Sequence, residues 1–262
     1  MLARRRMPPK FMEWNEQWGA PFGYPRKTAQ RFWGKFLSQS MVIRLGGPFC
    51  IQPNTKNRKY EYPWAFQAVP IEEGMRVADL GGGLAGFQFV LDKTGAQVVN
   101  IDPGLDAEGL GWKCDEKSMA MLNRLLGTTV KLENTTIIEA SIEKESLDVV
   151  YSISVLEHLA EETFWDTVKG VWDALKVGGK FVVTTDLFLN LHPFASRKTN
   201  RYGTNFPIAQ IDGFETFELI SDDPKELYGS DSFDTDHILS HLEEFCVGSY
   251  PAMAQCLVLE KK

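Results

Sequence analysis

The chain has 262 residues, 44% of them hydrophobic and 24% charged, which is ordinary for a globular protein with a substantial core. It has no run of about 20 apolar residues, and no apolar stretch follows its charged N-terminus, so neither a membrane span nor a secretory signal is expected. The four cysteines form no C-x-x-C pair, which argues against a zinc site or a disulfide framework and favours reduced thiols in a cytoplasmic protein.

The charges are unevenly distributed along the chain. Residues 1–70 hold 12 Lys/Arg and 3 Asp/Glu, a net charge of +9, whereas the remainder holds 16 and 32, a net charge of −16. A basic arm on an acidic body can bind an acidic or phosphorylated partner, including nucleic acid, or it can pack against its own body. We predict an N-terminal extension over residues 1–70 and leave both interpretations open.

The same extension is rich in aromatic side chains. Trp14 and Trp18 are four residues apart, as are Phe32 and Phe36, so each pair can share one face of a helix. These aromatics either attach the extension to the core or form a lid over a substrate.

The most informative stretch is Met75–Phe87, Met-Arg-Val-Ala-Asp-Leu-Gly-Gly-Gly-Leu-Ala-Gly-Phe. The apolar run Val77–Leu80 predicts a buried strand, and the apolar residues after Gly86 predict a helix. Glycines between a strand and a helix permit positive φ and let a ligand approach the backbone closely. This pattern is typical of a nucleotide-type site, although Gly81, Gly83 and Gly86 also match the G-x-G-x-x-G of dinucleotide enzymes.

Asp79 discriminates between the two cofactor classes. A carboxylate beside the glycine turn would repel the pyrophosphate of a dinucleotide but attract a cationic or zwitterionic ligand. S-adenosylmethionine has a sulfonium, an ammonium group and no phosphate. Asp79 therefore favours S-adenosylmethionine over NAD.

Further along, the segment Ala96–Pro103 reads as a strand that ends at Asp102, about 20 residues beyond the first glycine. An acid at this place is expected to bind ribose hydroxyls, and we expect it not to be needed for folding. The other predicted elements are a helix over Glu116–Leu126, a third strand over Thr135–Glu139, a fourth strand and turn within Leu147–Leu159, a strand over Phe181–Thr185 after a Gly-Gly turn, a strand over Phe217–Ser221, a helix over Asp236–Phe245 and a last strand over Ala252–Leu259.

The sequence resembles the class I S-adenosylmethionine-dependent methyltransferases, in particular the type 11-like small-molecule subgroup. Asp79, Gly81 and Gly83 match their first motif, with Ala85 where a third glycine usually falls, and Leu147–Leu159 is similar to their fourth strand and following turn. The resemblance implies an α/β fold with a Rossmann-like, doubly wound, seven-stranded sheet that is mostly parallel with an antiparallel last strand. It further implies a methyltransferase domain over 71–262, with an irregular insertion at 187–213.

The resemblance also implies S-adenosyl-L-methionine as the cofactor and a small molecule as the methyl acceptor. The residues expected to contact the cofactor lie at strand ends and in the extension: Asp79, Gly81, Gly82, Gly83, Asp102, Pro103, Ser141, Ile142, Ser152 and Tyr60, with Trp64 as a further candidate.

His158 and His192 are the candidate general bases, because oxygen and nitrogen acceptors can require proton removal. Glu157 is expected to face solvent. His237 and His241 have helical i, i+4 spacing after several aspartates, but no third ligand is fixed in the pattern, so we predict a solvated helix face and no metal.

Three alternatives remain open from the sequence. An RNA methyltransferase would use the basic arm, an NAD-binding oxidoreductase would use the glycine turn, and a non-catalytic binding protein would keep the pocket without turnover. The acceptor and the oligomeric state are not determined by these patterns.

Overall fold

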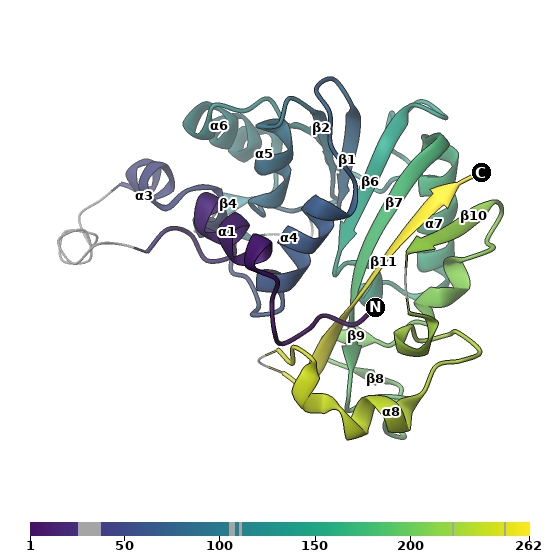
Figure 1. Ribbon diagram of the computed structural model, residues 1–262. Helices are drawn as coiled ribbons and strands as arrows, with labels where there is room; N and C mark the ends of the chain where they lie inside the picture. The colour runs from purple at the N-terminus through teal and green to yellow at the C-terminus, as the bar shows by residue number, and fades with distance from the viewer. Residues whose placement is uncertain (26–37, 105–107, 110–111, 222, 249) are drawn as a thin grey trace.

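The computed structural model describes residues 1–25, 38–104, 108–109, 112–221, 223–248 and 250–262 (Figure 1). A seven-stranded sheet forms its centre, with strand order β10-β11-β7-β6-β1-β2-β5. The strands of this sheet are β1 (Arg76–Leu80), β2 (Gln97–Ile101), β5 (Lys131–Glu133), β6 (Leu147–Ile153), β7 (Leu175–Phe188), β10 (Phe217–Ser221) and β11 (Ala252–Lys261).

Six of the seven strands run in the same direction. β1 is parallel to β2 and β6, β2 to β5, and β6 to β7, whereas β11 is antiparallel to both β7 and β10. The last strand of the chain thus lies between β7 and β10. The predicted fold class, a doubly wound α/β sheet with an antiparallel last strand, is confirmed.

Helices cover both faces of the sheet (Figure 1). They are α1 (Pro9–Trp18), α3 (Gln39–Gly46), α4 (Arg58–Ala68), α5 (Phe87–Asp92), α6 (Glu116–Leu126), α7 (Glu161–Ala174) and α8 (Thr235–Ser240). Short 3-10 turns are η2 (Pro48–Cys50), η3 (Leu156–His158), η4 (Ile208–Ile211), η5 (Pro224–Glu226) and η6 (Leu242–Glu244), and two small hairpins pair β3 (Glu108–Gly109) with β4 (Trp112–Lys113) and β8 (Thr199–Asn200) with β9 (Gly203–Thr204).

Alternation along the strands divides the core into two layers. Val77 and Val149 belong to a cluster with residues of α1, α5 and α6, whereas Ala78 and Val150 belong to a cluster with residues of α7. Successive side chains of a strand point to opposite faces, so strands covered on both sides are apolar throughout. This arrangement leaves the carboxyl ends of the parallel strands as the place where loops can form a site.

The N-terminal segment packs on the α5 side of the sheet. Trp14 of α1 is buried with its ring centroid 5.9 Å from Phe49, 5.4 Å from Phe66 and 6.5 Å from Phe87. At the start of the chain, Arg4 forms a 2.5 Å ion pair with the carboxylate of Glu226. At Arg4 the basic N-terminal segment therefore packs against the acidic body of the chain. Phe32, Trp33 and Phe36 lie outside the described residues.

Two predicted elements differ from the structure. The third strand is Lys131–Glu133, because these residues pair with Val99–Ile101 of β2, and Thr135–Glu139 forms a turn instead. The helix predicted over Asp236–Phe245 ends at Ser240, whose hydroxyl donates to the carbonyls of Asp236 and His237 and so competes with a continuing helix.

The helix over Glu116–Leu126 is confirmed. Asp115 caps its first turn by accepting the Ser118 N–H at 2.7 Å, and Gly127 ends it with φ 67°.

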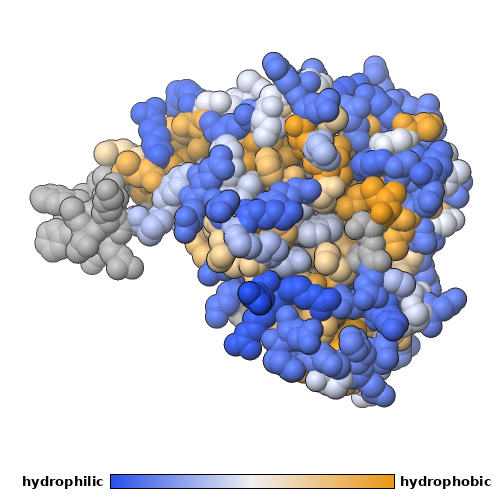
Figure 2. Space-filling view, in the orientation of Figure 1, coloured by the Kyte–Doolittle hydropathy of each residue, from blue (hydrophilic) through white to orange (hydrophobic). Residues whose placement is uncertain are grey.

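Hydrophilic side chains predominate on the surface over α8, and hydrophobic ones appear in smaller patches on the face shown in Figure 2. Of the helices in the described ranges, none is both long and apolar enough to cross a membrane.

Candidate active site

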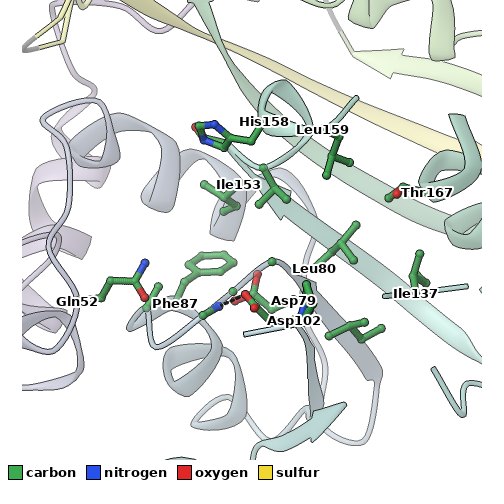
Figure 3. A pocket seen from close by; sticks show the side chains of 18 of the residues that line it. Gln52, Asp79, Leu80, Phe87, Asp102, Ile137, Ile153, His158, Leu159 and Thr167 are labelled. Carbon is green, nitrogen blue, oxygen red and sulfur yellow. Dashed lines mark hydrogen bonds between the residues drawn. The ribbon is translucent and has the colours of Figure 1, made fainter. Parts of the chain in front are cut away.

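A cavity of about 470 Å³ opens at the carboxyl ends of β1, β2 and β6 (Figure 3). Asp79 and Asp102 lie side by side near its centre, with the apolar side chains of Leu80 and Ile137 on one side and Phe87 and Gln52 on the other. His158 lies across the cavity from the two carboxylates. The cavity therefore has a paired acidic centre, an apolar end and one histidine at its wall.

The glycine turn between β1 and α5 forms the floor of this cavity. Gly81 and Gly83 have φ of 68° and 52°, a left-handed conformation that residues with a Cβ rarely adopt. Gly82 has no such constraint, but a Cβ there would lie 2.6 Å from Oδ2 of Asp79. Only glycine at this position leaves the carboxylate its present place.

Asp102 fastens this turn to the end of β2. Its Oδ2 accepts the N–H of Gly83 at 2.8 Å, and its Oδ1 accepts the N–H of Gly104 at 2.6 Å. Each carboxylate oxygen keeps a further lone pair for a hydroxyl donor. Asp102 thus has a structural role in the turn as well as the geometry of a ligand-binding acid, contrary to the expectation that folding does not need it.

Asp79 is buried, and its Oδ2 has no hydrogen-bond partner within the described structure. Burial, reinforced by the nearby Asp102, raises the pKa of Asp79 to about 7, while Arg58 acts in the opposite direction. An unpaired buried carboxylate is costly unless a cation or donor completes it. Asp79 is therefore suited to a positively charged group in the cavity.

The N-terminal segment completes the wall. Gln52 accepts the N–H of Leu84 at 2.8 Å through its Oε1, and Tyr62 of α4 stacks on Phe87 with ring centroids 5.5 Å apart. Arg58, on the same face of α4 as Tyr62, also lines the cavity. Gln52, Arg58 and Tyr62 were not among the predicted site residues, and the i, i+4 spacing of Arg58 and Tyr62 is the sequence signal that points to them.

Comparisons with known proteins agree with this arrangement. Residues 78–183 match the family model described as "Methyltransferase domain". This range runs from β1 to β7 and contains the glycine turn, Asp102 and the turn that carries His158. By this match, residues 78–183 belong to the methyltransferase domain family.

Solved structures show the same fold at low sequence identity. The [4+2]-cyclase SpnF is 12% identical with a TM-score of 0.55, and the match covers 91% of this chain and 98% of that one. An S-adenosylmethionine-dependent methyltransferase from Mesorhizobium loti is 17% identical with a TM-score of 0.51, covering 76% and 97%. YcgJ from Bacillus subtilis is 11% identical with a TM-score of 0.50, covering 77% and 98%. A search of curated proteins gives no match.

Behind the cavity wall, the protein contains a buried polar cluster centred on Arg58. Its Nη1 lies 2.8 Å from Oε2 of Glu61 and 2.5 Å from the hydroxyl of Ser154. Oε1 of Glu61 accepts the hydroxyls of Ser154 and Thr184, each at 2.7 Å. Glu61 is fully buried, so the guanidinium compensates a charge that would otherwise be unpaired.

Two more carboxyl groups belong to this cluster. Glu157, which we expected to face solvent, is 1% exposed, and its Oε1 accepts the N–H of Asp186 at 2.9 Å. Its position on the 3-10 turn η3 directs its side chain toward the end of β7 instead of into solvent. Burial and the neighbouring Asp186 raise the pKa of Glu157 well above its usual range. Burial likewise raises the pKa of Asp186 to about 6, although Tyr250 donates to it at 2.6 Å.

The structure brings some of the predicted site residues together in the cavity and places others elsewhere. Lining the cavity are Asp79, Gly81, Gly82, Gly83, Asp102, Pro103 and His158. Ser141 is exposed, Ile142 packs against the core beneath α7, and Ser152 is completely buried. In the region expected for Ser141 and Ile142, the cavity is lined by Thr135, Thr136 and Ile137, because the third strand ends earlier than predicted.

The aromatic candidates on α4 point away from the cavity. Tyr60 is buried against Phe11 with ring centroids 5.1 Å apart, and Trp64 packs against the core beside it. They lie on the opposite side of the helix from Arg58 and Tyr62.

The remaining histidines lie outside the cavity lining. Nδ1 of His192 is 3.0 Å from the hydroxyl of Tyr228. In α8, Nδ1 of His241 is 2.8 Å from the carbonyl oxygen of His237, and Asp234 caps the helix by accepting the His237 N–H at 2.9 Å. Over the described ranges, the protein has no group of three or more His, Cys, Asp or Glu side chains placed to hold a metal ion.

Proposed function

We propose that the protein transfers the methyl group of S-adenosylmethionine to an oxygen or nitrogen atom of a small-molecule acceptor, with the cofactor in the 470 Å³ cavity. The observation that carries this proposal is the unpaired, buried Oδ2 of Asp79 at the glycine turn. A carboxylate without a partner fits the ammonium group of the cofactor and disfavours the pyrophosphate of NAD.

The other lining residues fit the remaining parts of the cofactor. Asp102 has lone pairs for the ribose hydroxyls, and the apolar side chains of Leu80, Ile101 and Ile137 suit the adenine ring. When bound, S-adenosylmethionine supplies a methyl group already activated by its positively charged sulfur. The protein's own contribution is then alignment of the acceptor and exclusion of water.

His158 is the group we propose to remove a proton from the acceptor. Its turn follows β6 directly, it lines the cavity, and among the described lining residues it is the one whose ordinary pKa lies near neutrality. An imidazole at this position can accept a proton from a hydroxyl group as the methyl group is transferred, or from an ammonium group beforehand, which frees the nitrogen lone pair for the transfer.

The charge distribution favours a small acceptor over RNA. Two basic residues of the N-terminal segment, Arg4 and Arg58, are already paired with Glu226 and Glu61, and the body of the chain is acidic. A polyanion would meet repulsion from that body.

The test is cofactor binding followed by turnover. Calorimetric titration should give binding of S-adenosylmethionine and of S-adenosylhomocysteine and none of NADH, and Asp79→Asn should weaken both. Release of S-adenosylhomocysteine is then measured with panels of hydroxyl and amine acceptors and with RNA.

Each result has a consequence for the proposal. Binding of NADH alone would refute the cofactor assignment. Turnover that requires RNA and falls steeply with rising salt concentration would refute the small-molecule acceptor. Tight cofactor binding with no turnover on any acceptor would indicate a binding protein, which the likeness in fold to a cyclase makes a necessary control.

A further inference from the structure

A second cavity, of about 250 Å³, lies between the 187–213 insertion and the segment before β11. It is lined by two arginines, two asparagines and two tyrosines: Arg197, Arg201, Asn190, Asn200, Tyr202 and Tyr250. The described lining contains no acidic side chain. Pro251 completes the lining, and a cavity that presents basic, amide, aromatic and apolar groups suits an anion with an adjoining flat or apolar part.

The two guanidinium groups retain their positive charge toward the cavity. Within the described structure, neither Arg197 nor Arg201 has a carboxylate within 4.0 Å. The insertion 187–213 holds three basic residues and one acid, although residues 71–262 as a whole carry a net charge of −16. The positive charge is therefore local to this cavity.

The side chains on one wall are held in place by stacking. The guanidinium of Arg201 lies 4.5 Å from the ring centroid of Tyr202 and donates to the Tyr202 hydroxyl. Tyr202 in turn stacks on Tyr250, with centroids 4.3 Å apart and planes at 17°, and Tyr250 stacks on Phe188. Contact with the ring limits the freedom of the Arg201 side chain, so it loses little entropy on binding, and the guanidinium has further N–H donors besides the one bonded to Tyr202.

Hydrogen bonds fix the backbone of the insertion around the cavity. The N–H of His192 donates to the carbonyl of Arg197 at 2.7 Å, and the N–H of Tyr202 donates to Oδ1 of Asn200 at 2.7 Å. Nδ2 of Asn200 donates to Oδ1 of Asn190 at 3.3 Å. The backbone around the cavity and the Asn190 and Asn200 side chains are thus arranged before any ligand arrives.

We propose that this cavity binds the phosphate group of a small phosphorylated molecule. Two guanidinium forks and two amides offer more donors than the two oxygens of a carboxylate can accept, whereas a phosphate monoester has three acceptor oxygens and a charge near −2. The cavity volume and the acidic body around it favour a small ligand over a nucleic acid chain.

This site adjoins the active site without depending on its assignment. Tyr250 lines the second cavity, and its hydroxyl donates a hydrogen bond to the carboxylate of Asp186. The backbone N–H of Asp186 in turn donates to the carboxylate of Glu157 in η3. Gly203 of β9 approaches the carbonyl of Glu157 so closely that a Cβ there would lie 2.2 Å from its oxygen. A chain of hydrogen bonds therefore runs from the second cavity to the turn that carries His158.

The test is calorimetric titration of the full chain with phenyl phosphate, benzoate and a short RNA at low ionic strength in phosphate-free buffer. We expect binding of phenyl phosphate, at least tenfold weaker in Arg197→Gln and in Arg201→Gln. Arg124→Gln, which changes an exposed arginine on α6, is the matched control and should bind like the parent protein. Thermal unfolding of each variant shows that the fold is retained.

S-adenosylhomocysteine affinity, measured on the same variants, separates this site from the cofactor cavity and should change by less than twofold. Benzoate binding as tightly as phenyl phosphate would overturn the phosphate assignment. If RNA binds more tightly than phenyl phosphate and this binding is lost in the arginine variants, the proposal of a small ligand is refuted. Equal phenyl phosphate affinity in the parent and both arginine variants would overturn the site.

Discussion

Oδ2 of Asp102, at the end of β2, accepts the backbone N–H of Gly83 at 2.8 Å, so the acid of one strand holds the glycine turn of its neighbour. The contact joins two residues 19 positions apart in the sequence. One carboxylate therefore holds the shape of the turn and, in the function we propose, also contacts the ligand.

Substitutions at Asp102 should separate these two roles. Asp102→Ala leaves the N–H groups of Gly83 and Gly104 without their acceptor, so we expect a loss of about 1–3 kcal/mol in the free energy of unfolding. Asp102→Asn retains one acceptor oxygen and should lose less stability. Both variants should bind S-adenosylhomocysteine more weakly by calorimetry. Full stability in the alanine variant, measured by urea unfolding, would contradict the structural role.

Cofactor affinity should depend on the protonation of Asp79. Because the pKa of this carboxyl is raised to about 7, lowering the pH through 7 protonates it and removes the charge that attracts the ammonium group. S-adenosylhomocysteine affinity should therefore rise between pH 6 and pH 8. The pH dependence should vanish in Asp79→Asn, and a profile that is flat in the parent protein would count against this residue.

Asp79 should lower the free energy of unfolding when no cofactor is bound. A carboxyl whose pKa is raised on folding contributes stability that is present below its unfolded pKa and is lost as the pH rises through 7. Asp79→Asn should therefore be more stable than the parent at pH 8, by at most about 4 kcal/mol, and the difference should shrink at pH 5. Melting temperatures without ligand at both pH values measure this.

Gly82 should tolerate no side chain. In Gly82→Ala the new Cβ would meet Oδ2 of Asp79 at 2.6 Å and Oδ1 of Asn100 at 3.0 Å, so the carboxylate must move. We expect at least tenfold weaker cofactor binding. Gly178→Ala is a suitable control, because its Cβ would meet nothing within 4 Å and only its φ of +80° is strained. Similar cofactor affinities in the two variants would show that a Cβ at position 82 does not disturb the Asp79 carboxylate.

Replacing Arg58 should lower the free energy of unfolding, because the buried carboxylates around it lose their positive partner. Arg58→Met leaves Glu61 buried without its cation, and we expect a loss of about 3–5 kcal/mol at pH 8. Because the remaining carboxyls then bind protons more readily in the folded state, the loss should be smaller at pH 5.5. Urea unfolding at the two pH values tests this, and a loss independent of pH would indicate a packing effect alone.

His158→Gln should lower turnover more than binding. If the imidazole accepts the acceptor's proton, kcat should fall by about 10²–10⁴-fold, while S-adenosylhomocysteine affinity stays within twofold. The acid limb of the pH–rate profile should also disappear. His192→Gln, at a histidine outside the cavity lining, is the comparison and should retain parent activity; equal losses in both variants would argue against His158 as the base.

The sequence by itself determined the architecture and the centre of the cavity. The apolar strands, the glycine turn after Val77–Leu80 and the acid at Asp102 are local patterns, and local patterns fix which strand end carries which side chain. The helix over Glu116–Leu126 was predictable for the same reason, since both of its caps are in the sequence.

The tertiary structure alone decided which faces and partners these elements have. Tyr60 and Trp64 have the same four-residue spacing as Arg58 and Tyr62, so the helical period could not show which pair faces the cavity. The buried Glu157 carboxylate accepts a hydrogen bond from Asp186, which is 29 residues away in the sequence. The second cavity depends on the stacking of Tyr250 with Tyr202. Contacts between residues distant in sequence leave no periodic signal, because they are set by how the sheet brings its strand ends together.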